Sequence, residues 1–131
     1  MLFGKLCQIV ATMPSWVALA INQDELDLNP PGGSRYRPEP MHTSADLLKG
    51  LEKSLADARA ALKNASDADL QKPWRLLVAG NVVSESPRHV VIRDMLNHLA
   101  HHRGQMTVCL RLLGATVSAL YGPSADDNRF D

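Results

Sequence analysis

The feature that most constrains the fold is one long stretch, residues 87–113 (PRHVVIRDMLNHLAHHRGQMTVCLRLL). It opens on Pro87, which suits the first turn of a helix because no N–H is needed there, and Gly114 follows it as a stop. Between them one row of residues recurs at spacings of three and four, which places the whole row on one side of a helix. The row consists of Val91, Met95, His98, His102, Met106, Cys109 and Leu113. The stretch therefore predicts a long helix with Met95, Met106 and Leu113 in the core.

Two histidines, His98 and His102, stand one helical turn apart in this otherwise apolar row. Imidazoles at i and i+4 are neighbours on a helix surface and can bind one metal ion together. Asn97 and Gln105 lie close by and suit hydrogen bonds that fix the imidazole tautomers. The alternative is that both histidines are core or interface residues satisfied by hydrogen bonds, since three protein ligands are the usual minimum.

The rest of the chain predicts two more helices and some irregular structure. Residues 2–22 have the spacing of an amphipathic helix with a kink at Pro14, and residues 23–42 are rich in proline and glycine and predict a long crossover loop. Thr43 or Ser44 caps the next helix, residues 66–70 add a short turn, and residues 74–84 predict a small irregular hairpin. The buried stripe of the helix after Thr43 is expected to be Leu48, Leu51, Leu55, Ala58 and Leu62. The tail beyond Gly114 is expected to fold back across the bundle.

Composition sets modest limits on function. A length of 131 residues predicts a single domain over residues 1–131, and 14 basic residues balance 14 acidic ones, so no nucleic-acid or membrane partner is indicated. The arginines of the last helix are expected to form a solvated face; they are Arg88, Arg93, Arg103 and Arg111. The two cysteines have no CxxC spacing, and no signal peptide or membrane-spanning run is evident, which predicts reduced thiols and a cytoplasmic location.

The string NHLAHHRGQ (residues 97–105), with LYGPSADD (residues 120–127) in the tail, resembles the DinB-like family. Members are small bacterial four-helix bundles, many of which carry a three-histidine divalent-metal site. The resemblance extends to GKLCQIVATMPSW (residues 4–16), which follows the second helix of the family. It implies an all-α, up-down helical bundle, here with three main helices because the family's first helix is missing. Ile9 occupies the position where many relatives place the first metal-binding histidine, so the resemblance implies a lost ligand position.

The resemblance implies a partial site in which His98 and His102 bind Zn²⁺ or Ni²⁺ weakly. Related proteins include thiol-dependent S-transferases and a maleylpyruvate isomerase, which makes a low-molecular-weight thiol the implied second cofactor. Two functions stay open: a metal-dependent thiol S-transferase or hydrolase-type enzyme, and a catalytically silent bundle that acts as a binding or oligomeric module. Since the ligand set is incomplete, weak or no catalysis is the first expectation.

Helix geometry limits which other residues could complete the site. Cys109 lies about 10.5 Å along the helix from His102, and Cys7, Asp94 and His101 point elsewhere or lie too far from one member of the pair. A carboxylate from residues 24–27 or a group from a partner chain stays possible. Without the family's first helix an apolar groove would be exposed, which predicts a homodimer, unless the natural chain starts upstream.

Overall fold

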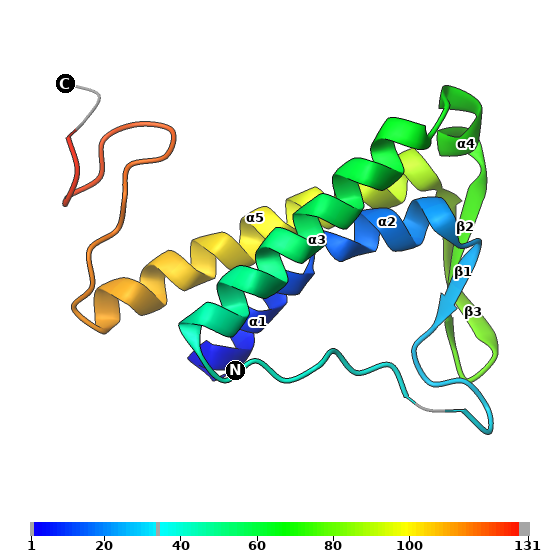
Figure 1. The fold of residues 1–131 in the computed structure, drawn as a ribbon, viewed down its shortest axis with the longest axis horizontal. Helices are drawn as coiled ribbons and strands as arrows, with labels where there is room; N and C mark the ends of the chain where they lie inside the picture. The colour runs from blue at the N-terminus through cyan, green and yellow to red at the C-terminus, as the bar shows by residue number, and fades with distance from the viewer. Residues whose placement is uncertain (1, 34, 129–131) are drawn as a thin grey trace.

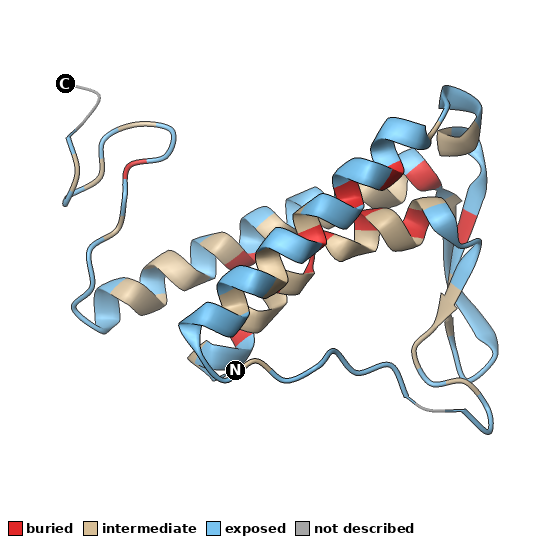
Figure 2. Ribbon diagram, viewed as in Figure 1, coloured by how far each residue is buried: buried red, intermediate tan, exposed pale blue. Residues whose placement is uncertain are grey.

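The computed structural model describes residues 2–33 and 35–128. Figure 1 shows that α1, α2, α3 and α5 lie side by side as a bundle, with the strands gathered at the end where α2 stops and α5 begins. Buried residues are concentrated where these helices meet (Figure 2). The elements along the chain are α1 (Phe3–Thr12), α2 (Ser15–Asn22), β1 (Glu25–Asp27), α3 (Ser44–Asn64), α4 (Asp67–Gln71), β2 (Pro73–Val78), β3 (Asn81–Pro87) and α5 (Arg88–Leu112).

The predicted kink in the first helical segment is confirmed. α1 ends at Thr12, α2 begins at Ser15, and the two helices are bent by 44° relative to each other. Pro14 lies at the break, where it lacks the N–H of a continuing helix and its ring crowds the preceding turn. No single described helix is long and apolar enough to cross a membrane, although α1 and α2 taken together meet the length and composition of a broken span.

The start of α3 follows the predicted cap. The Thr43 hydroxyl accepts a hydrogen bond from the Asp46 N–H at 3.1 Å, and the Asp46 carboxylate accepts one from the Thr43 N–H at 2.9 Å. The expected stripe is confirmed only in its middle: Ala58 is buried and Leu51 and Leu55 are half-buried, but Leu48 is 62% exposed and Leu62 is 46% exposed. The face packed on α1 and α2 is turned toward small side chains, which allow the helix backbones to approach closely. Its buried residues are Ser54, Ala58 and Ala61.

The strands form a mixed sheet in the order β1-β2-β3, with β1 parallel and β3 antiparallel to β2. The hairpin turn has two left-handed residues, Ala79 (φ 52°) and Gly80 (φ 77°), as a two-residue type I′ turn requires. The Asp27 carboxylate accepts hydrogen bonds from the N–H groups of Ala79 (3.1 Å) and Gly80 (2.7 Å). One side chain therefore ties β1 to a turn far along the chain.

The predicted all-α class is wrong, because this three-stranded sheet accompanies the five helices. The small irregular hairpin is confirmed, with a register shift between Leu76 and Leu77. β1 was not predicted, since three residues are too few to show an alternating pattern. Its strand conformation comes from pairing with β2, where Glu25 lies opposite Arg75.

α5 begins directly after Pro87, and Gly114 (φ 74°) lies just beyond its end, as predicted. It packs on α1 and α2, and its buried residues are Arg88 and His102. Met95 and Met106 are half-buried, but Leu113 is 67% exposed and is not a core residue. The reason is visible in Figure 1, where the C-terminal end of α5 projects beyond α1 and α3.

The tail beyond Gly114 is non-helical, as predicted, but it does not cross the bundle. It turns back beside α5 alone, and Arg111 of α5 pairs with Asp126 at 3.1 Å. Within the tail, Asp126 accepts the Val117 N–H and Ser124 donates to the Val117 carbonyl. The described part of the tail is thus a self-bonded loop held at the exposed end of α5.

Candidate functional site

The histidine pair lies on α5 with its rings adjacent. The ring centroids of His98 and His102 are 4.5 Å apart, and the ring planes are tilted by 36°. His102 is buried at 9% exposure, whereas His98 is more open and lines a pocket. Two imidazoles one turn apart on the same side of a helix have the placement that shared ligation of one ion requires.

The tautomer of His102 follows from its neighbour. Gln105 Oε1 lies 2.8 Å from His102 Nδ1. Because an amide oxygen can only accept a hydrogen bond, this contact favours the tautomer of the neutral ring in which Nδ1 carries the proton and Nε2 has the lone pair. A hydrogen bond of this kind orients a metal-binding imidazole. Asn97 is exposed and, within residues 2–33 and 35–128, its side chain has no hydrogen bond to either ring.

The protonation state of His98 also suits a ligand. Partial burial lowers the pKa of His98, and the neighbouring imidazoles of His102 and His101 lower it further by charge repulsion. The neutral form, which has a lone pair for a metal, is therefore favoured. His101 itself is exposed, with its ring centroid 5.3 Å from that of His102.

Position 9 borders the same pocket as His98, across the contact between α1 and α5. Its side chain is the half-buried isoleucine Ile9, which cannot coordinate an ion. Among the residues that the structure describes, no group of three or more His, Cys, Asp or Glu side chains is placed to hold a metal. Of the three positions that the sequence resemblance implies for metal ligands, the chain therefore has histidine at two, His98 and His102.

The carboxylates of residues 24–27 are engaged elsewhere. Asp24 pairs with Arg88, Glu25 pairs with Arg75 at 2.5 Å, and Asp27 binds the hairpin turn. Arg88 was expected on a solvated face, and this expectation is wrong, since its guanidinium is 7% exposed. Arg88 donates to the Ile21 carbonyl at 2.7 Å, so it closes the C-terminal end of α2 rather than facing solvent.

The cysteines do not approach the pair. Cys7 lies with its sulfur 3.9 Å from that of Met106, on the side of α1 that faces the later part of α5. Burial raises the pKa of the Cys7 thiol, and the nearby Cys109 raises it further. A thiol of raised pKa is protonated at neutral pH and is a poor metal ligand or nucleophile.

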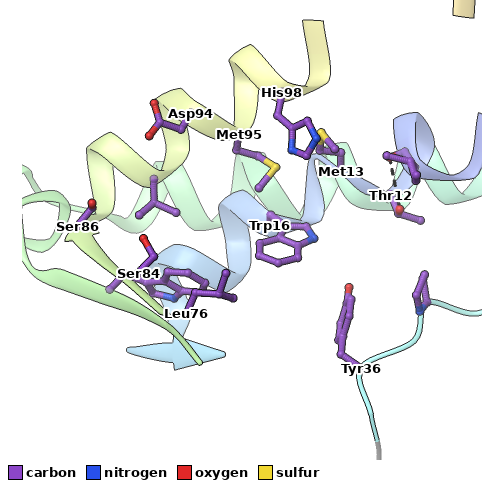
Figure 3. Close-up of a pocket in the computed structure, with 14 residues that line it drawn as sticks. Thr12, Met13, Trp16, Tyr36, Leu76, Ser84, Ser86, Asp94, Met95 and His98 are labelled. Atoms are coloured by element: carbon purple, nitrogen blue, oxygen red, sulfur yellow. Dashed lines mark hydrogen bonds between the residues drawn. The ribbon is translucent and has the colours of Figure 1, made fainter. Parts of the chain in front are cut away.

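Beside His98 the structure contains a pocket of about 470 Å³, bordered by α1, α2, the crossover loop, the hairpin and α5. Figure 3 shows Trp16 and Met95 in its centre, Tyr36 on the loop side, and Ser84, Ser86 and Asp94 grouped at the other end. Ring contacts link Trp16 to Tyr36 (centroids 6.1 Å apart) and to Trp74 (6.3 Å). The volume lies within the range of small-molecule sites.

Sequence reasoning missed the aromatic part of this site. Trp16 was interpreted as a packing residue, and Tyr36 and Trp74 belong to a loop and a strand with no common pattern. Trp74 is 4% exposed, and its indole N–H has no acceptor among the described residues. The sequence signal that could have indicated it is that the chain has few such residues: it contains two tryptophans and two tyrosines, and three of these four border this pocket.

The fold and the histidine pair define a small helical-bundle protein whose last helix presents two candidate metal ligands. The family model described as DinB family matches residues 21–129, so the chain belongs to the DinB family. The resemblance drawn from the sequence is thereby confirmed, although Ile9 lies outside the matched range.

A curated relative is the "Uncharacterized protein YrdA" of Bacillus subtilis (strain 168). It is 32% identical over 92 residues, which cover 67% of this chain and 51% of YrdA. The chain therefore spans about half the length of this curated relative. No solved structure matches the chain.

Proposed function

We propose that this DinB family protein binds a divalent ion, Zn²⁺ or Ni²⁺, weakly through His98 and His102. The observation that carries the proposal is the pair itself: adjacent rings, with the His102 Nε2 lone pair left free by the Nδ1 contact to Gln105. The lowered pKa of His98 supports it, because a neutral imidazole competes better for metal. These residues fit two ligand positions, and Ile9 fits none.

The incomplete ligand set favours a binding module with weak or no catalysis. A second candidate is a metal-dependent thiol S-transferase or hydrolase-type enzyme, and the specific observation that favours it is that His98 lines a pocket large enough for a substrate. A divalent ion, when bound, would supply Lewis acidity toward a thiol or water. The chain's own contribution is to orient the pair through Gln105 and to surround the site with apolar walls.

We also propose that the protein associates with a second copy of itself. Several large apolar side chains of α5 are open to solvent: Leu96 is 54% exposed, Val108 is 58% exposed and Leu112 is 82% exposed. Exposed apolar surface of this kind favours association.

The reduced state of Cys7 and Cys109 as free thiols is compatible with the cytoplasmic location that the sequence predicts.

The metal proposal is tested by calorimetric titration of Zn²⁺ into the protein and three variants. His102→Ala is expected to weaken binding at least about tenfold, because the better-oriented ligand is lost, while Ile9→His is expected to tighten it by completing three imidazoles. His89→Ala is the matched control, since His89 is on the same helix but contacts the Leu70 carbonyl instead. Tight binding that survives in His102→Ala would refute the assignment, and no gain in Ile9→His would show that position 9 does not face the pair.

A further inference from the structure

We infer that the pocket beside His98 binds a flat aromatic molecule with an uncharged, amide-like polar group. The inference deepens the proposed function and rests on it in one respect: His98, one of the two proposed metal ligands, borders this pocket. Binding of the aromatic molecule itself does not require a metal ion. It follows from the shape of the wall, from its polar end and from its charge.

The aromatic part of the wall comes from separate elements that the fold brings together. Trp16 belongs to α2, Tyr36 to the crossover loop and Trp74 to β2, and Trp16 makes edge contacts with both of the others. Met13 and Met95 lie beside them (Figure 3). Aromatic rings and thioethers together favour a planar, polarisable ligand over a branched aliphatic one.

The polar end of the pocket lies opposite Tyr36. Ser84 and Ser86 are two residues apart on β3, so their hydroxyls stand on the same face of the strand. Asp94 of α5 borders this end, with its side chain 67% exposed (Figure 3). Hydroxyls both donate and accept hydrogen bonds, and a carboxylate accepts them. A group with both an acceptor and a donor, such as a primary amide, matches this set.

The charge of the wall disfavours an anionic head group. No lysine or arginine is found among the described residues that border the pocket, whereas the Asp94 carboxylate is there. Arg93 lies with its Nε 3.9 Å from the Asp94 carboxylate, but both side chains are 67% exposed and Arg93 does not border the pocket. A carboxylate or phosphate on the ligand would therefore find no cationic lysine or arginine in the wall to pair with.

The test uses the whole chain with a chelator present and compares naphthalene-2-carboxamide with naphthalene-2-carboxylate by calorimetric titration at pH 7.5. The amide is expected to bind at least tenfold more tightly than the carboxylate. Asp94→Asn should reduce the ratio of the two affinities, because the naphthalene carboxylate should bind more tightly while the affinity for the amide stays the same. Asp57→Asn, which changes an exposed residue on α3, should leave the ratio unchanged.

Two aromatic variants locate the binding site. Tyr36→Ala is expected to lower the affinity for the amide at least fivefold. Because this loop residue is 37% exposed, the variant tests binding without disturbing the core. Trp16→Leu should weaken it further. Quenching of tryptophan fluorescence by the amide gives a second readout, because both tryptophans of the chain border the pocket.

The inference is overturned if the amide does not bind at millimolar concentration, if the carboxylate binds equally well, or if Tyr36→Ala leaves the affinity unchanged. Because a chelator is present throughout, these outcomes leave the metal proposal standing. Conversely, failure of Zn²⁺ to bind His98 and His102 leaves amide binding in the pocket unaffected.

Discussion

Replacing Arg88 with alanine tests how the strand end of the bundle is held together. Arg88 is the first residue of α5, and its buried guanidinium donates to the Ile21 carbonyl at 2.7 Å and to the Gln23 carbonyl at 3.4 Å. It also pairs with the Asp24 carboxylate at 2.5 Å. One side chain therefore joins the start of α5 to the end of α2 and to the approach to β1.

The size of the effect depends on which of these contacts matters. A hydrogen bond from a charged group to a buried acceptor contributes about 1.5–3 kcal/mol, and the 2.7 Å contact to Ile21 qualifies, whereas the 3.4 Å contact to Gln23 adds little. The side chain of Asp24 is 84% exposed, so solvent screens the ion pair to about 0–1 kcal/mol. With the loss of the packed aliphatic stem, Arg88→Ala is expected to cost about 2–4 kcal/mol, and Asp24→Asn less than about 1 kcal/mol.

Urea unfolding followed by circular dichroism measures both variants. With a dependence of about 2 kcal/mol per molar urea, the middle of the usual range, Arg88→Ala should lower the midpoint by roughly 1–2 M. Arg93→Ala is the matched control on the same helix, where the side chain is 67% exposed, and should change stability by less than about 0.5 kcal/mol. The reasoning fails if Asp24→Asn costs as much as Arg88→Ala, because the ion pair rather than the carbonyl contacts would then hold this end.

Three further outcomes are expected. Asp27→Ala should cost about 1–2 kcal/mol in urea unfolding because the turn amides lose their acceptor; a cost equal to that of the exposed Asp57→Ala would contradict this. Since the pKa of His98 is lowered in the folded protein, the unfolded chain takes up the proton at a higher pH, so the free energy of unfolding should fall as the pH drops through about 6.5. His98→Asn should make the free energy of unfolding less dependent on pH in this range, and an unchanged dependence would contradict the assignment to His98. Light scattering at micromolar concentration should give a mass above that of one chain, reduced to one chain in Leu112→Glu; a monomeric wild type would refute self-association.

Local signals account for the parts of the fold that were predicted correctly. The break at Pro14, the cap at Thr43, one of the two residues predicted for it, and the stop at Gly114 each depend on a few neighbouring residues, so local sequence is enough to predict them. The hairpin is of the same kind, because Ala79 and Gly80 form its turn between two β-prone runs.

The errors arise where distant segments meet. β1 is a strand because β2 lies beside it and because Asp27 reaches the amides of the hairpin turn. The buried face of α3 was predicted only in part: Ala58 is buried as expected, but Ser54 and Ala61 are buried where Leu48 and Leu62 were expected to be. Arg88 looked like a surface cation until the end of α2 supplied carbonyls for it. None of these partners is visible in a local window of sequence.

The candidate site also has a part that local sequence predicts and a part that depends on the packing of distant segments. His98, His102 and Gln105 lie within eight residues of one helix, so helical periodicity alone makes the two rings neighbours and places Gln105 beside His102. The third donor of a three-histidine site would come from α1, and its position relative to the pair depends on how α1 packs against α5. An increase in zinc affinity on Ile9→His would therefore measure tertiary packing, whereas the loss on His102→Ala measures the helix. If the first change has no effect and the second does, the pair is a ligand set of α5 alone, and any further donor to the ion must come from solvent, a bound thiol or a second chain.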